Sequence, residues 1–241
     1  MSFVLGVDVG QAKDFTALVL LERRYPAPDP DPNRIVIAAD MSLACAFIER
    51  PALRTSYPAV VERVAEVLAK PRLRGRCDLV VDYTGVGRPI VDMMRGASLP
   101  VQPVTITGGH KETFDDEEGA WRVPKRDLVS RLLTMVDSGR LKFAPKLELA
   151  GTLAKELDAF RPKTSAHGHS NYESWREGVH DDLVLALALA TWWALKSPHV
   201  PDPRAGGKPH VFSPERADWD EQQFDDEEER RADERKRWGS R

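Results

Sequence analysis

Apolar and polar positions follow two different periods along the first 197 residues, and the change of period marks the expected secondary structure. Short apolar runs bounded by turn residues are typical of buried strands, and apolar residues three or four positions apart are typical of amphipathic helices. We expect strands at 3–7, 15–21, 34–39, 78–81 and 99–106, and a short extended piece at 141–143. We expect helices at 58–69, 89–94, 126–136, 147–160 and 182–195.

The order of these segments predicts the fold class. Three strands joined by short connections indicate an antiparallel meander, and the later strands, which are separated by helices, indicate an α/β architecture. We therefore expect a mixed central sheet, with three antiparallel strands followed by parallel strands and with helices on both faces. The polar, glycine-containing segment at 108–121 is expected to be a loop.

Composition divides the chain into a domain and a tail. Residues 1–197 have the apolar content of one globular domain, whereas 198–209 are rich in Pro and Gly and 215–241 mix both charges densely. We expect the segment 198–241 to be a disordered tail. The net charge of −3 does not by itself indicate a nucleic-acid-binding protein. The longest apolar run, at 183–195, is shorter than the roughly 20 residues that a membrane span needs, so no membrane partner is expected.

Four aspartates carry the candidate chemistry. Asp8 and Asp82 each end an apolar strand before a glycine turn, and Asp181 and Asp182 begin the last apolar helix. Taken singly, each could be a turn former or a helix cap. Taken together, they form a set of carboxylates that suits Mg²⁺ or Mn²⁺, and without a cation such a set would repel itself. Two such ions can activate a water molecule and stabilise the leaving oxygen of a phosphodiester.

Four segments around these acids resemble the nuclease domain of the large terminase subunit of tailed phages, in the RNase H-like, RuvC-like superfamily. They are GVDVGQAKDFTALVLLE at 6–22, DLVVDYTGVGRPIVDMM at 78–94, VPKRDLVSRLLTMVDSGRLKFAP at 123–145 and HDDLVLALALATWWA at 180–194. The resemblance extends over about residues 3 to 196. It implies an RNase H-like fold and a metal-dependent endonuclease that cuts double-stranded DNA during genome packaging.

The resemblance also implies roles for single residues. Asp8 would bridge two divalent cations, Asp82 would hold one of them and the Asp181–Asp182 pair the other. Adjacent helix residues point about 100° apart, so one of the pair is expected to face the site, and the choice stays open. Asp14 is a candidate for an auxiliary acid beside the metal ligands. His180 could contact phosphate or water, or have only a structural role at the helix start.

DNA contacts need basic side chains near the acids, because most of the affinity for DNA comes from its phosphates. The candidates are Lys13, Arg88, Lys125, Arg126, Arg161 and Lys163. Each could equally be a solvated surface residue. The loop that contains Arg161 and Lys163 also has two aromatic residues, an arrangement that suits a DNA-facing hairpin but also an ordinary exposed loop.

A full large terminase also has a packaging ATPase, but the sequence contains no GxxxxGK[ST] phosphate-binding loop. The chain could be a nuclease domain cut from a longer protein or a free-standing nuclease. A separate ATPase chain, a small terminase subunit and a portal are then the expected partners, in the cytoplasm of an infected bacterial host.

Three other functions are compatible with parts of the pattern. A RuvC-type Holliday-junction resolvase would share the fold and the metal chemistry. Actin-like kinases and ATPases also begin with a strand, an Asp and a glycine turn, but they need two duplicated domains and have no use for the HDD helix. A non-catalytic interaction module would use the acids structurally and the charged tail for recruitment.

Overall fold

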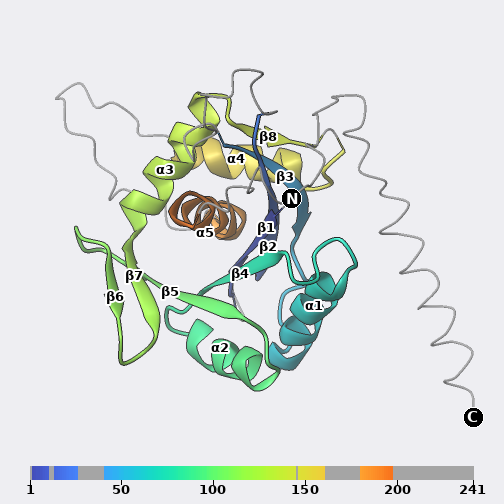
Figure 1. Cartoon of the computed structure of the whole chain (residues 1–241), viewed down its shortest axis with the longest axis vertical. Helices are drawn as coiled ribbons and strands as arrows, with labels where there is room; N and C mark the ends of the chain where they lie inside the picture. The colour runs from blue at the N-terminus through green and yellow to red at the C-terminus, as the bar shows by residue number, and fades with distance from the viewer. Residues whose placement is uncertain (1, 11–13, 27–40, 145, 161–179, 198–241) are drawn as a thin grey trace, which may run out of the picture.

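A single eight-stranded sheet forms the centre of the protein in the computed structural model, which describes residues 2–10, 14–26, 41–144, 146–160 and 180–197 (Figure 1). The strands lie in the order β6-β7-β5-β4-β1-β2-β3-β8. Their bounds are β1 Ser2–Asp8, β2 Ala17–Arg24, β3 Ser42–Glu49, β4 Cys77–Asp82, β5 Val101–Thr107, β6 Thr113–Asp115, β7 Ala120–Pro124 and β8 Leu141–Phe143.

The sheet has an antiparallel part and a parallel part. Strands β1, β2 and β3 pair antiparallel in chain order. Strand β4 pairs parallel to β1, β5 parallel to β4 and β7 parallel to β5. The predicted α/β class, with three antiparallel strands followed by parallel ones, is therefore confirmed, as expected for an RNase H-like fold. The carboxyl ends of β1, β3, β4, β5 and β7 consequently meet along one edge of the sheet.

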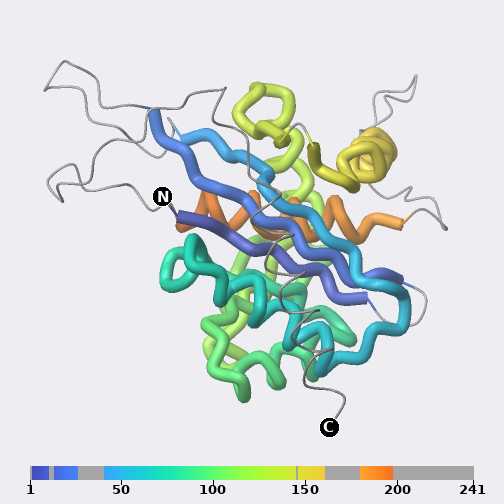
Figure 2. The backbone as a smooth tube through the Cα atoms, turned by 90° about the vertical axis from the view of Figure 1, so that its right-hand side faces the viewer, coloured from blue at the N-terminus to red at the C-terminus, as the bar shows by residue number. Residues whose placement is uncertain are grey.

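Helices cover both faces of the sheet. They are α1 Tyr57–Ala69, α2 Gly87–Gly96, α3 Lys125–Asp137, α4 Ala150–Phe160 and α5 Asp182–Lys196. Helix α5 packs on β1, β2 and β4, and α3 and α4 pack on α5, whereas α1 and α2 lie on the opposite face (Figure 1). Figure 2 shows α5, in orange, running along the first three strands, in blue.

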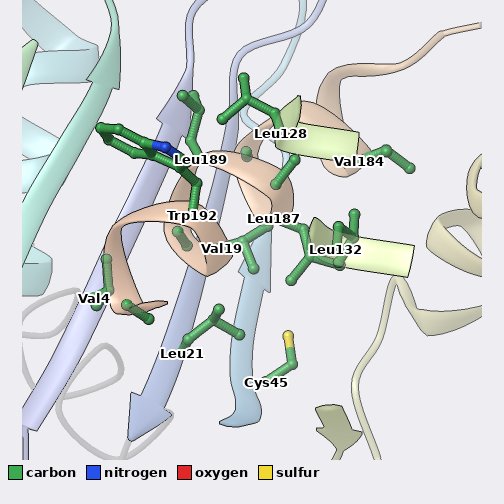
Figure 3. Close-up of a cluster of buried hydrophobic side chains, with 14 of the residues drawn as sticks. Val4, Val19, Leu21, Cys45, Leu128, Leu132, Val184, Leu187, Leu189 and Trp192 are labelled. Atoms are coloured by element: carbon green, nitrogen blue, oxygen red, sulfur yellow. The ribbon is translucent and has the colours of Figure 1, made fainter. Parts of the chain in front are cut away.

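Strand alternation decides which side chains face α5. In β1, Val4 belongs to the core beneath α5, whereas Phe3, Leu5 and Val7 belong to the core beneath α1 and α2. Figure 3 shows Val4 among the side chains of α5 and α3, which include Leu187, Trp192, Leu128 and Leu132. Because successive strand residues point to opposite faces, Gly6 and Asp8 lie on the α5 side.

Helix α5 is apolar on all sides and buried along most of its length, which is typical of a helix inside a core. It approaches β1 closely at Gly6, where a β-carbon would lie 2.2 Å from the Ala186 carbonyl oxygen and 2.9 Å from the Ala190 β-carbon. No side chain fits between the two backbones at this point. The contact lies one helical turn after Asp182 and two residues before Asp8, so it fixes the helix start relative to the strand end.

Two parts of the sequence-based prediction differ from the structure. The third strand is β3, at Ser42–Glu49, which the apolar pattern did not predict, and the expected strand at 34–39 lies outside the described residues. The segment 108–121 is not wholly a loop, because β6 forms within it and pairs antiparallel with β7. The tail at 198–241 also lies outside the described residues. Within the described ranges, no helix is long and apolar enough to cross a membrane.

Candidate active site

Asp8 and Asp82 come together because of the register between two central strands. The parallel pairing sets Val7 of β1 opposite Val81 of β4, so the next residue on each strand is an aspartate. Both side chains point to the α5 face, since Val4 and Val80 lie in the core on that face. The two carboxyl groups lie close enough to interact directly, and this interaction raises the pKa of Asp8 and lowers that of Asp82.

The turn after β4 holds the Asp82 backbone and side chain in place. Oδ1 of Asp82 accepts a hydrogen bond of 2.8 Å from the Thr84 backbone N–H, which is an Asx turn. Helix α2 then begins so close that a β-carbon on Gly87 would lie 1.9 Å from the Asp82 carbonyl oxygen. Asp82 is therefore a turn former, but the turn leaves its carboxyl group beside Asp8.

The start of α5 brings the second pair of acids to the same edge of the sheet. Asp182 is buried and Asp181 is half-buried. Although Asp181 occupies the N-cap position, its side chain makes no capping hydrogen bond with the described part of the chain. Glu156 of α4 does this instead, because its Oε2 accepts hydrogen bonds from the backbone N–H groups of Leu183, at 3.1 Å, and Val184, at 3.3 Å. The interpretation of Asp181 as a simple helix cap is therefore wrong.

The acids perturb one another's ionisation. Burial raises the pKa of Asp8 well above its ordinary value, and the charges of Asp82, Asp182 and Asp181 raise it further, in that order. Burial also raises the pKa of Asp82, and the hydrogen bonds from Thr84 partly offset this rise. Burial raises the pKa of Asp182 to about 6, against the opposing effect of the Arg50 charge. Asp8 thus experiences the charge of all three other acids, which means that the four carboxylates form one cluster.

Two basic side chains neutralise the pair at the start of α5. The ammonium group of Lys125, the first residue of α3, lies 2.9 Å from Oδ2 of Asp181, and its charge also lowers the pKa of Asp82. Nη2 of Arg50, which directly follows β3, lies 3.3 Å from Oδ2 of Asp182. Nδ1 of His180 lies 4.0 Å from Oδ2 of Asp182, and the imidazole ring is edge-on to the Phe15 ring.

The donor chemistry of this cluster suits hard divalent cations. All four acids offer carboxylate oxygens, which Mg²⁺ and Mn²⁺ prefer, and a cation would relieve the repulsion that Asp8 experiences. Oδ2 of Asp182 is buried and, within the described residues, accepts no hydrogen bond. In the same part of the chain, no three acidic, His or Cys side chains converge closely enough to coordinate one ion. The carboxylates therefore fit such ions in donor type, while Lys125 and Arg50 form ion pairs with two of them.

The remaining predicted residues are less closely connected with the cluster. Asp14 is exposed, and no hydrogen bond or ion pair joins it to the described part of the chain. Arg88 pairs with Glu118 at 2.8 Å and lies over the Tyr83 ring, so its guanidinium is engaged away from the acids. Arg126 follows Lys125 at the same edge of the sheet and donates a 3.0 Å hydrogen bond to the His110 carbonyl oxygen. Three further candidates lie outside the described residues, namely Lys13, Arg161 and Lys163.

Comparisons with known proteins found similarity to solved structures, at low sequence identity. No protein-family model and no curated protein matches the sequence. The structure is similar to large terminase nucleases. With that of thermophilic phage G20c with bound magnesium, the TM-score is 0.49 at 22% identity, over 79% of this chain and 80% of that one. With the nuclease domain of the bacteriophage SPP1 large terminase with bound manganese, the TM-score is 0.45 at 13% identity, over 79% and 85%.

Two residues of the site were not predicted from the sequence. Glu156 is buried and Arg50 nearly so, they form an ion pair, and both contact the first turn of α5. Glu156 carries a signal that could have revealed it, because it lies between Leu153 and Phe160 on the buried stripe of α4. A charged residue on such a stripe is expected to have a buried partner. Arg50 carries no comparable signal, since it follows its strand in an ordinary turn position.

Proposed function

We propose that this chain is a divalent-metal-dependent endonuclease that cuts double-stranded DNA, as the nuclease domain of a phage large terminase does. The observation that carries the proposal is the cluster of Asp8, Asp82, Asp181 and Asp182, which are far apart in the sequence and share one electrostatic environment. The motifs around these residues resemble that family in the same order along the chain. An ordinary surface would not gather three carboxylates around a buried fourth one, because the repulsion is costly.

Asp8, Asp82 and Asp182 are the proposed direct metal ligands. Asp8 has the central position, since the three other acids all raise its pKa, and it would contribute to holding the cations. Asp182 acts on Asp8 more strongly than Asp181 does and is the more buried of the pair. Asp181 would stay on the outer side of the site with Lys125. When bound, two Mg²⁺ or Mn²⁺ ions would supply activation of the attacking water and stabilisation of the leaving oxygen.

The chain's own basic residues would hold the substrate. Lys125 lies at the rim of the cluster, with its side chain about one-third exposed, and its ammonium group can bind a DNA phosphate. Arg126 follows Lys125 in the same helical turn, is exposed, and would bind the next phosphate along the strand. Arg88, Lys13, Arg161 and Lys163 remain proposed DNA contacts. None of these contacts reads a base, so cutting with little sequence preference is expected.

A plasmid-nicking assay tests the proposal. Purified protein is incubated with supercoiled plasmid in Mn²⁺, in Mg²⁺ and in EDTA, beside the Asp8→Asn variant. Cleavage that requires the cation and disappears in Asp8→Asn supports the proposal, whereas a fully active Asp8→Asn protein would overturn it. A parallel assay on four-way junctions and linear duplex separates a terminase-like nuclease from a resolvase, because only a resolvase strongly prefers the junction.

In this function the protein would work with a packaging motor in the cytoplasm of an infected bacterium. A separate packaging ATPase, a small terminase subunit and a portal are the proposed partners. Pull-down of such an ATPase from infected cells, with and without residues 198–241, would test whether the charged tail contributes to the assembly.

A further inference from the structure

Arg50 connects the end of β3 to the first turn of α5. Its guanidinium group forms an ion pair with Glu156 and lies 3.3 Å from Oδ2 of Asp182. It also lies over the Phe15 ring, 5.0 Å from the ring centroid. The side chain is nearly buried, so its charge acts on these two carboxylates with little screening by water.

Glu156 has two contacts that act on the same helical turn. Its Oε2 accepts the backbone N–H groups of Leu183 and Val184, which directly follow the acid pair, and its Oε1 accepts a hydrogen bond from Arg50. It therefore fixes the direction in which α5 begins and at the same time competes with Asp182 for one guanidinium group.

The two ion pairs of Arg50 are unequal. The pair with Glu156 is a direct hydrogen bond, whereas the contact with Asp182 at 3.3 Å lacks hydrogen-bond geometry. Among the described residues, Oδ2 of Asp182 has no hydrogen-bond donor and Nε of Arg50 has no acceptor. Arg50 thus lies beside Asp182 without donating a hydrogen bond to it, and its hydrogen bond goes to Glu156 instead.

We infer that Glu156 is a positioning residue that keeps Asp182 available to a divalent cation by drawing Arg50 away from it. This inference rests on the proposed function, since it assumes that Asp182 binds the metal. Residues around a metal ligand commonly act in this way, because they orient the ligand and tune its basicity. Glu156 contacts no reacting atom, so its effect would pass through Arg50 and Asp182 alone.

The isosteric change Glu156→Gln isolates this role. A glutamine carbonyl oxygen can still accept the two α5 backbone N–H groups, so the helix cap is retained. The negative charge is lost, however, and Arg50 is left with Asp182 as its one neighbouring carboxylate in the described structure. We expect the Mn²⁺ concentration for half-occupancy to rise about 10-fold, in keeping with changes around other metal ligands.

The experiment is a titration with Mn²⁺ in which the free ion is followed by electron paramagnetic resonance, on the full chain, with DNA cleavage measured in parallel. The inference is supported if Glu156→Gln binds Mn²⁺ more weakly than the wild type. The double variant Arg50→Gln/Glu156→Gln should then regain an Mn²⁺ affinity within about 3-fold of the wild type. The matched control is Glu66→Gln, which removes an ion pair with Arg63 on α1 and should bind Mn²⁺ as wild type does.

Unchanged Mn²⁺ binding by Glu156→Gln would overturn the inference. A double variant that binds Mn²⁺ as weakly as Glu156→Gln would also overturn it, because Glu156 would then have a purely structural role. Should the double variant fail to fold, the Glu156→Gln titration alone decides. Wild-type protein that binds Mn²⁺ but never cuts DNA overturns the proposed nuclease, while the binding titration still tests Glu156. If the wild-type protein cuts DNA and Glu156→Gln binds Mn²⁺ as the wild type does, this inference is overturned. The proposed nuclease function is then still supported.

Discussion

Nη2 of Arg50 lies 3.3 Å from Oδ2 of Asp182, so the end of β3 supplies the countercharge for the first residue of α5. The neighbouring acid, Asp181, has a different countercharge, because it pairs with Lys125 from α3. The two adjacent aspartates therefore have different surroundings, since Asp182 is buried and Asp181 lies at the rim of the cluster. We expect their replacement to reduce the cleavage rate to different extents.

Replacement of Asp182 should be more damaging than replacement of Asp181. We expect Asp182→Asn to reduce the DNA cleavage rate at least about 100-fold and Asp181→Asn by less than about 10-fold, as for a direct ligand and a neighbour of a ligand. Initial rates of plasmid nicking at saturating Mn²⁺ measure both effects. The reverse order would make Asp181 the direct ligand and Asp182 a structural acid paired with Arg50.

Asp8→Asn should stabilise the fold while it removes activity. The variant eliminates a buried carboxyl group that three other acids disfavour, and an asparagine amide can donate to Asp82. We expect a gain on the order of 1 kcal/mol in the free energy of unfolding at pH 8, or about 2–4 °C in Tm. The matched control, Asp92→Asn on exposed α2, should change stability by less than about 0.5 kcal/mol.

The stabilisation by Asp8→Asn should also depend on pH. The pKa of Asp8 is higher in the folded protein than its ordinary value of 3.8, so Asp8 takes up a proton on folding. The contribution of Asp8 to folding stability is complete below its pKa in the unfolded chain. It is lost as pH rises through its pKa in the folded protein. The advantage of Asp8→Asn should therefore be largest at pH 8 and shrink towards pH 4, as thermal unfolding in EDTA would measure. An advantage that grew on acidification would contradict the assigned direction of the shift.

Gly6→Ala should destabilise the protein, because a β-carbon at this position meets the Ala186 carbonyl oxygen at 2.2 Å. Insertion of one carbon into a packed core costs about 1–3 kcal/mol, measurable by urea unfolding. Gly151→Ala is the matched control, since a β-carbon there meets nothing within 4 Å and the residue lies in α4. That control should stabilise by up to about 1 kcal/mol. Equal stability of the two variants would show that α5 can shift away from β1.

Arg126→Gln should weaken DNA binding and reduce its dependence on salt. Loss of one phosphate contact lowers the slope of log K against log salt concentration by about 0.9 for duplex DNA. Fluorescence anisotropy with a labelled duplex in EDTA, between low and moderate salt, measures this slope. Arg74→Gln removes an arginine that precedes β4, at the opposite edge of the sheet, and should leave the slope unchanged. An equal effect of both substitutions would mean that the protein binds DNA only through its overall charge.

The sequence predicted the acids of the site because strand-end positions follow from local patterns. Asp8 and Asp82 each end an apolar strand, and parallel strands of one sheet bring such ends together. It did not predict β3, where Ala44, Cys45 and Ala46 replace the β-branched residues that mark most strands. Nor did it predict β6, because Gly and acidic residues surround its three residues. In both strands, pairing with a neighbour overrides weak local preference.

The partners of the acids could not be predicted, since they depend on tertiary packing. Nothing local connects Arg50 to Asp182 or Lys125 to Asp181, and each pair forms only when strands and helices distant in the chain pack together. The choice between Asp181 and Asp182 was open for the same reason. Burial and the neighbouring charges distinguish the two residues, and neither is a property of the HDD motif itself.

The two strands that carry Asp8 and Asp82 are the innermost pair of the eight-stranded sheet, whereas β6 and β8 at its margins have only three residues each. Backbone amides at the margins of a sheet exchange with solvent through local opening, and those at its centre exchange mainly through global unfolding. Fraying of the short outer strands therefore leaves the spacing of the two carboxyl groups intact. We therefore expect Asp8 and Asp82 to lie in the slowest-exchanging part of the molecule and to stay side by side when the outer strands open.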